Sequence, residues 1–313
     1  MNQSKFSLAD LITLLTAIAF GFACFIGVYF YTLGDTKQSV ILAVIIAVLL
    51  GGTALGAKLL KRTSRNFKSC FIWEMILLVL FTLLMVFFSY SPFPHYFVVS
   101  EQKEEIQSKL RASITQAENM FSEYNEYADN RENLYKSKLQ SIVATKNVNP
   151  TAYKDFGFVD NNGVSDDKQI ENKMFSLNAD LFPSNFAQTK LVDSTWLANA
   201  RKTVDGTFFM GIVGTVNDVE QNSNNWLNEL IKPSKVREKG EQTEDFAYNL
   251  SFEDVKKHFT TLGSPTLISI GFSVLAYLLM LFSWFVTKRH SRFPGIHVIF
   301  GKEKGYIDDG VQL

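Results

Sequence analysis

The chain has 313 residues, and its 31 basic residues balance its 31 acidic residues at a formal net charge of zero. The balance is uneven, because residues 92–264 hold 25 acidic and 19 basic side chains and the remainder therefore carries a positive excess. Neither cysteine, Cys24 or Cys70, lies in the acidic region, which excludes a disulfide-stapled domain there. A region of that length can bury enough surface to fold without such staples, which fits a bacterial envelope protein.

Four apolar stretches are long enough to cross a membrane, at residues 11–33, 39–60, 70–91 and 266–286. A helix needs about 20 apolar residues to span the hydrocarbon layer of a phospholipid bilayer. The first and last stretches have no charged residue, and the other two have one each, Lys58 and Glu74. The first stretch is longer than a typical signal-peptide core and no small-residue cleavage site follows it, so we interpret it as a span. The sequence thus predicts a four-span membrane protein.

The polar break between the second and third stretches is strongly basic. Its sequence, KLLKRTSRNFKSC, holds five cations, Lys58, Lys61, Arg62, Arg65 and Lys68. The preceding loop has Lys37 alone. Short cytoplasmic loops collect Lys and Arg, so both termini and residues 58–69 are predicted to be cytoplasmic. The apolar flanks argue against a nucleic-acid patch and favour anionic lipid headgroups as neighbours of this loop.

This orientation gives the predicted organisation of the chain. It comprises a three-span region at 1–92, an external helical domain at 93–264, a fourth span at 265–287 and a cytoplasmic tail at 288–313. The expected class is a mainly α membrane protein with a large stalk-like domain inserted between spans three and four.

Small residues recur at helical spacing in the first two spans. Such faces let two helix backbones approach closely. They predict packing between spans one and two, or contact between subunits, through Ala19, Ala23 and Gly27 of the first span and Ala43, Ala47, Gly51, Gly52 and Gly56 of the second.

The external region contains two long helical patterns. Apolar residues recur with a 3,4 spacing from Ile106 to Ile142, which predicts an amphipathic helix of about 45 residues. A second pattern runs from Leu197 to Leu230, and we favour one helix there, although the glycines in GTFFMGIVGTV leave a hairpin at 206–216 open. The stripe of the first helix predicts an interface with other copies or other subunits, centred on Ile114, Phe121, Tyr124 and Tyr135.

Residues capable of chemistry are sparse. Glu74 lies about one turn beyond Lys68, so we expect a structural carboxylate at the membrane interface, with a proton-relay role as the weaker alternative. His95 and His258 bracket the external domain without nearby thiolate or carboxylate ligands, so no metal site is expected. No nucleophile with its base, phosphate loop or redox motif is recognisable. The sequence predicts no catalysis, no cofactor and no small-molecule substrate.

The tail after the fourth span is short. Residues 297–300 and 306–308 predict a small hairpin around GKEKG, and an isolated pair of strands is only marginally stable in water. We therefore expect it to dock on a cytoplasmic partner through His297, Ile299, Phe300 and Tyr306.

The whole layout, with the fourth span leading into KRHSRFPGIHVIFGKEKG at 288–305, resembles TssN, a membrane component of the type VI secretion variant that lacks the usual membrane core complex. The resemblance implies a scaffold in the bacterial inner membrane that anchors a contractile injection machine together with other envelope subunits. The alternative is a sensor or signal transducer with a helical ectodomain, although the tail is too short for a kinase or methyl-accepting domain. Uncharged spans disfavour a transporter.

Overall fold

A computed structural model describes residues 7–63, 67–160, 163–206 and 209–289. Within these ranges the chain forms helices and loops, and no strand occurs among them. Four helical segments are long and apolar enough to cross a membrane, at Leu8–Tyr31, Thr36–Arg62, Ser69–Glu101 and Leu267–Val286. The prediction of a mainly α membrane protein with four spans is confirmed at this level.

The chain divides into two compact units. The membrane unit comprises Met1–Gln102 and His258–Leu313, and the helical unit comprises Lys103–Lys257. The predicted external domain starts at residue 93, whereas the compact helical unit starts ten residues later. The reason is the short helix α4 (Phe93–Glu101), which packs on α1 (Leu8–Tyr31) and so belongs with the membrane helices.

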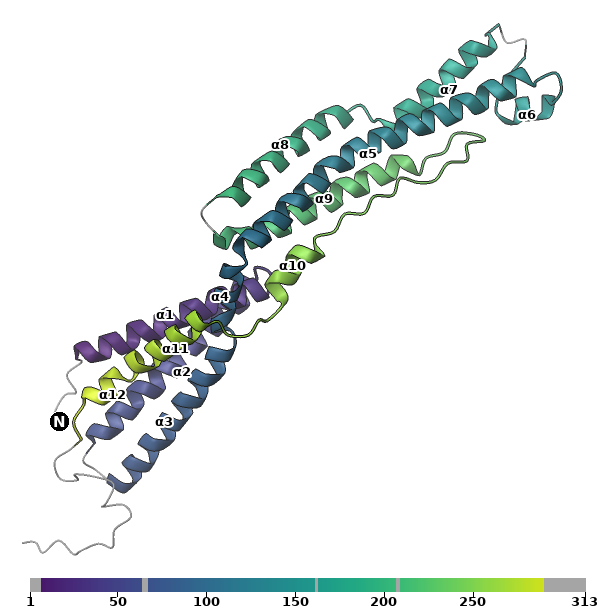
Figure 1. Ribbon diagram of the computed structural model, residues 1–313. Coiled ribbons are helices and arrows are strands. Elements are labelled where there is room, and N and C mark those ends of the chain that lie inside the picture. Colours follow the sequence, from purple (N-terminus) through teal and green to yellow (C-terminus); the bar gives the residue numbers. More distant parts are fainter. Residues whose placement is uncertain (1–6, 64–66, 161–162, 207–208, 290–313) are drawn as a thin grey trace, which may run out of the picture. The chain divides into compact units, whose positions relative to one another are not determined.

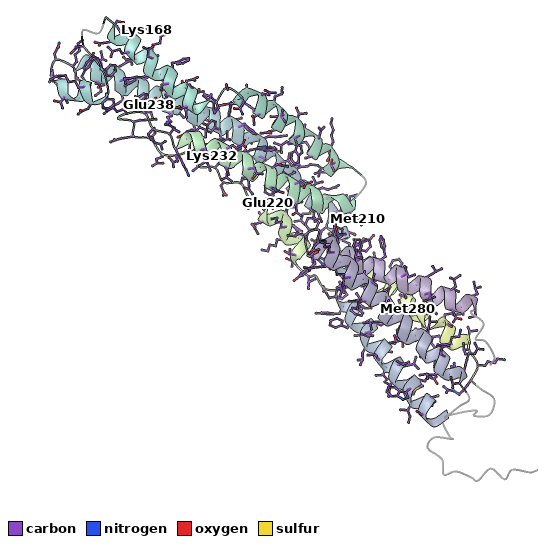
Figure 2. The ribbon with its side chains drawn as sticks, turned by 180° about the vertical axis from the view of Figure 1, so that it is seen from behind. Lys168, Met210, Glu220, Lys232, Glu238 and Met280 are labelled. Atoms are coloured by element: carbon purple, nitrogen blue, oxygen red, sulfur yellow. The ribbon has the colours of Figure 1, made fainter. Side chains whose placement is uncertain are left out.

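The membrane unit is a bundle of apolar helices. Helix α1 packs against α2 (Thr36–Arg62) and α11 (Leu267–Met280), and α2 packs against α3 (Phe67–Tyr90), as Figure 1 shows. The last span continues after Leu281 as the short helix α12 (Phe282–Val286). Side chains from α1, α2, α3, α4 and α11 share one core, which includes Phe20, Ile46, Phe81, Phe93 and Met280. Met280 is labelled in Figure 2 among these helices.

Small residues do bring α1 and α2 together, but the contact uses a different face of α1 from the predicted one. A Cβ atom placed on Gly21 would lie 3.0 Å from the Ala43 carbonyl oxygen, and one on Gly51 would lie 3.4 Å from the Ala17 Cβ. Of the other predicted residues, Ala47 faces Gly21, whereas Gly56 faces α3 and Gly27 adjoins Pro92. Ala19 and Ala23 line a groove beside α4 and α11. A Cβ atom placed on Gly52 would have no neighbouring atom within 4 Å.

The helical unit is organised around α5 (Lys103–Ala144), a helix of 42 residues that confirms the predicted amphipathic helix. After the short helix α6 (Pro150–Asp155), α7 (Asp166–Leu181) and α8 (Phe186–Asp205) pack along different parts of α5. Helix α9 (Ile212–Ser234) packs against α5 and α8. An irregular segment, residues 235–252, then leads to α10 (Glu253–Thr260). Lys168 and Glu238 lie towards one end of this unit, and Met210 and Glu220 lie towards the other (Figure 2).

The second long pattern is two helices, not one. Helix α8 ends at Asp205, and the chain resumes with a short 3-10 turn at Phe209–Gly211 before α9 begins at Ile212. Thr207 and Phe208 lie outside the described residues. Glycine is the poorest helix former after proline. Gly206 follows the end of α8 and Gly211 precedes the start of α9, so the helix is interrupted here although the apolar residues keep their helical spacing.

The apolar stripe of α5 is covered by its own unit. Ile114, Phe121, Tyr124 and Tyr135 are each at most 3% exposed. Phe121 and Tyr124 pack with Leu230 of α9 and Phe246 of the irregular segment, and Tyr135 packs against α7. The four residues that were predicted to form an interface therefore belong to the core of this unit. Three shorter helices and the irregular segment cover the stripe together, since none of them is long enough to cover it alone.

Candidate functional site

Buried charges are the most distinctive side chains of this fold, and the first group lies in the membrane unit. Asp10, in the first turn of α1, accepts a hydrogen bond from the Ser7 backbone amide at 2.8 Å as part of a capping box. Asp10 also forms an ion pair with Lys58 near the end of α2 and accepts a hydrogen bond from the Ser283 hydroxyl of α12. Both members of the ion pair are buried, so one carboxylate joins three helices.

Glu74 of α3 is at the centre of a second group. Its side chain is fully buried, and Oε1 accepts hydrogen bonds from the Trp284 indole at 2.9 Å and from the Arg289 guanidinium at 2.8 Å. The Lys61 ammonium lies 4.1 Å from the centre of the Trp284 ring and donates to the Trp284 carbonyl oxygen. The expected interfacial carboxylate is thus buried, and its cation comes from the end of the last span.

The two groups share one end of the membrane bundle. They involve the first turn of α1, the last turns of α2, the beginning of α3 and the end of α12, where the antiparallel helices bring their termini together. This is also the end that bears the basic loop. A buried carboxylate needs a partner because its desolvation is costly. Here Asp10 of α1 pairs with Lys58 of α2, and Glu74 of α3 pairs with Arg289, which follows α12.

The helical unit contains a third ion pair with a buried carboxylate, between Arg131 of α5 and Glu241 of the irregular segment. The two side chains are 1% and 2% exposed. Arg131 also donates to the Ser234 carbonyl oxygen at 2.9 Å, and Glu241 accepts from the Thr243 hydroxyl at 2.7 Å and the Glu238 amide at 3.0 Å. Burial alone would raise the pKa of Glu241, but these hydrogen bonds, led by that from Arg131, hold it below its usual range.

In the sequence, Arg131 interrupts the apolar stripe of α5. The structure makes Arg131 a fully enclosed member of that stripe, with its partner 110 positions along the chain. A lone arginine in a helical core position is itself a signal that a buried anion exists elsewhere, since charged residues are almost never fully buried unless paired. The identity of the anion is not visible from spacing.

The two histidines lie in separate hydrogen bonds. His95 is buried, and its Nε2 lies 2.7 Å from the Phe259 carbonyl oxygen. His258 has Nδ1 2.9 Å from the Gln102 side-chain oxygen. Among the described residues, no group of three or more His, Cys, Asp or Glu could hold a metal ion. The predicted docking residues of the tail, His297, Ile299, Phe300 and Tyr306, lie outside the described residues.

Comparison with known proteins adds no relative. No family model, no curated protein and no solved structure matches this chain. The buried charges and the arrangement of the helices are therefore the basis for a functional hypothesis.

Proposed function

We propose that this chain is a non-enzymatic scaffold subunit of the bacterial inner membrane. In this proposal both termini are cytoplasmic, the helical unit lies outside, and the chain anchors an envelope-spanning assembly of the type VI secretion kind. Its partners are the phospholipid bilayer, further copies of the chain and other envelope subunits.

Three ion pairs, each with a buried carboxylate, support the proposal. Each joins separate segments: Asp10–Lys58 joins α1 to α2, Glu74–Arg289 joins α3 to the end of the last span, and Arg131–Glu241 joins α5 to the irregular segment. Removing one partner of such a pair is strongly destabilising, so these contacts hold the helices in fixed arrangements. Transporters instead place charged or discontinuous elements near the middle of the bilayer, whereas the membrane pairs here lie at helix ends.

The topology can be tested by cysteine labelling in a Cys70→Ser background, with Cys24 left in place because it is buried. Val148 is 87% exposed in the helical unit, and a cysteine there is expected to react with a membrane-impermeant maleimide in intact spheroplasts. Thr63, exposed at the end of α2, is the matched position and is expected to react only after lysis. Labelling of Thr63→Cys in intact spheroplasts, with Val148→Cys protected, would reverse the proposed orientation.

The scaffold proposal also predicts the effect of removing residues 292–313. Deletion is expected to leave membrane insertion and the packing of both units intact while the protein loses a cytoplasmic partner, because all residues that the structure describes precede the deletion. Affinity purification in mild detergent, with mass photometry and identification of bound proteins, compares the full chain with the deletion. A full chain that is monomeric, binds nothing and supports secretion without its tail would exclude a scaffold.

A further inference from the structure

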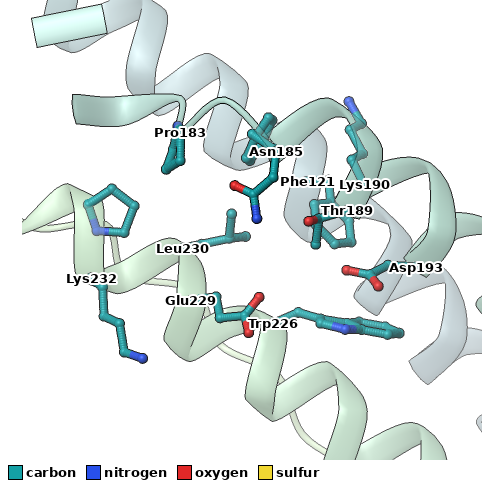
Figure 3. Close-up of a pocket in the computed structure, with 12 residues that line it drawn as sticks. Phe121, Pro183, Asn185, Thr189, Lys190, Asp193, Trp226, Glu229, Leu230 and Lys232 are labelled. Carbon is teal, nitrogen blue, oxygen red and sulfur yellow. The ribbon is translucent and has the colours of Figure 1, made fainter. Parts of the chain in front are cut away.

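A pocket of about 270 Å³ lies within the helical unit, between α8 and α9. Its apolar lining includes Phe121 of α5, Phe186 of α8, and Trp226 and Leu230 of α9, as Figure 3 shows. The volume is close to the lower end of the range for small-molecule sites, which are typically apolar with a few polar groups that fix orientation. The polar side chains of the lining include the carboxylate of Asp193.

Asp193 is unusual because it is buried and unsatisfied. Its side chain is only 6% exposed, and Oδ2 is fully buried without a hydrogen-bond partner among the residues that the structure describes. Burial raises the pKa of Asp193 to about 6, and the like charge of Glu229 on α9 adds to that shift. A buried polar atom without a partner costs free energy in the folded state, so such atoms are rare and call for an explanation.

The cations that line the pocket do not neutralise Asp193. Lys190 lies on α8 and Lys232 on α9, and within the described part of the chain neither donates to Oδ2 of Asp193. In Figure 3 their side chains point away from the Asp193 carboxylate. Glu229 is the remaining charged residue of the lining, and α5 contributes Phe121, which is uncharged. The buried side of the pocket is therefore acidic and aromatic.

We propose that this pocket binds a small organic ammonium ion, with the charged nitrogen at Asp193 and the apolar body against Trp226 and Phe121. A carboxylate compensates the positive charge, and an aromatic face attracts a cation within about 6 Å of the ring centre. A divalent metal fits less well, because calcium takes six to eight oxygen ligands and the lining has only two carboxylates. An anion would meet an uncompensated buried carboxylate.

The ammonium group of the ligand can donate a hydrogen bond to Oδ2 of Asp193, which lacks a donor among the described residues. No sequence motif points to such a ligand, because Asp193 and Trp226 belong to different helices that only the fold brings together. Binding of an amine would make the helical unit responsive to a ligand, whether the chain acts as a scaffold or as a sensor.

The test uses the full-length protein in detergent micelles with benzylammonium as the probe. Saturation-transfer NMR and thermal shift are expected to show binding with a dissociation constant below about 1 mM at about pH 8. Benzyl alcohol, which keeps the ring and removes the charge, is expected to bind at least tenfold more weakly. Asp193→Asn should weaken benzylammonium binding at least tenfold, whereas Asp218→Asn, at an exposed carboxylate of α9, should leave it unchanged.

A second measurement keeps the proposal falsifiable if binding is weak. Because the folded-state pKa of Asp193 is raised, its contribution to stability is present below the unfolded pKa and is lost as the pH rises through about 6. Without ligand, Asp193→Asn is thus expected to raise the melting temperature at about pH 8 and to have little effect at about pH 4. Equal binding of benzyl alcohol and benzylammonium, or unchanged benzylammonium binding by Asp193→Asn, would overturn the proposal.

Discussion

Replacing Arg131 with methionine is expected to lower the free energy of unfolding of the helical unit by about 3–5 kcal/mol. The substitution keeps much of the side-chain volume but leaves the Glu241 carboxylate 2% exposed without its cation. Glu241 would retain the Thr243 hydroxyl and the Glu238 amide, which do not neutralise its charge. The loss should appear throughout α5, because Arg131 lies in its middle and ties it to the irregular segment.

Amide hydrogen exchange of α5 in the full-length protein measures this effect, since protection reports the free energy of opening for each segment. The double variant Arg131→Met/Glu241→Met is expected to recover most of the loss, because an apolar pair of similar volume can replace a buried ion pair at little cost. Arg111→Met is the matched control on the same helix, since its ion pair with Asp205 is about half exposed, and it should cost less than about 1 kcal/mol. Equal protection in Arg131→Met and Arg111→Met would contradict a structural role for the buried pair.

The same ion pair has a defined pH dependence. The folded-state pKa of Glu241 is lowered, so its stabilising contribution is present above the ordinary glutamate pKa of 4.5 and is lost as the pH falls through the lower value. The difference in exchange protection between the parent protein and Arg131→Met should therefore be largest near neutral pH and shrink in acid.

Replacing Lys58 with methionine is expected to destabilise the membrane unit by about 3 kcal/mol or more. Asp10 would keep its bonds from Ser7 and Ser283, but it would lose the buried cation that compensates its charge. The consequence should reach both ends of the chain, since Asp10 connects α1 with α2 and with α12.

Thermal unfolding of the full chain in bicelles tests this expectation. Asp10→Asn/Lys58→Met removes both charges and should recover much of the loss, because the asparagine can still bond to the serines. Lys37→Met is the matched control, since Lys37 is an exposed lysine in the first turn of the same helix and should change the melting temperature little. If Lys58→Met and Lys37→Met unfold alike, the pair does not hold the membrane helices together.

The elements that depend on local sequence patterns could be predicted from the sequence. The four spans were predictable because a helix in lipid must satisfy its own backbone groups, so each span is a continuous apolar stretch such as Leu8–Tyr31. Helix α5 was predictable because its buried residues repeat with the period of a helix from Ile106 to Ile142. The capping box at Ser7 and Asp10 was predictable because its two residues are three positions apart.

Which segments cover each apolar helix face, and which charged residues form pairs, became clear from the tertiary structure. The stripe of α5 is buried by α7, α8, α9 and the irregular segment. The irregular segment has no periodic apolar pattern, so its packing on α5 could not be predicted from helical spacing. Glu241 lies 110 positions from Arg131 and Ser283 lies 273 positions from Asp10, so neither pairing has a local signal. The physical reason is that periodicity reports which face of a helix avoids water, whereas a buried charge is tolerated only where the folded chain brings a specific partner to it.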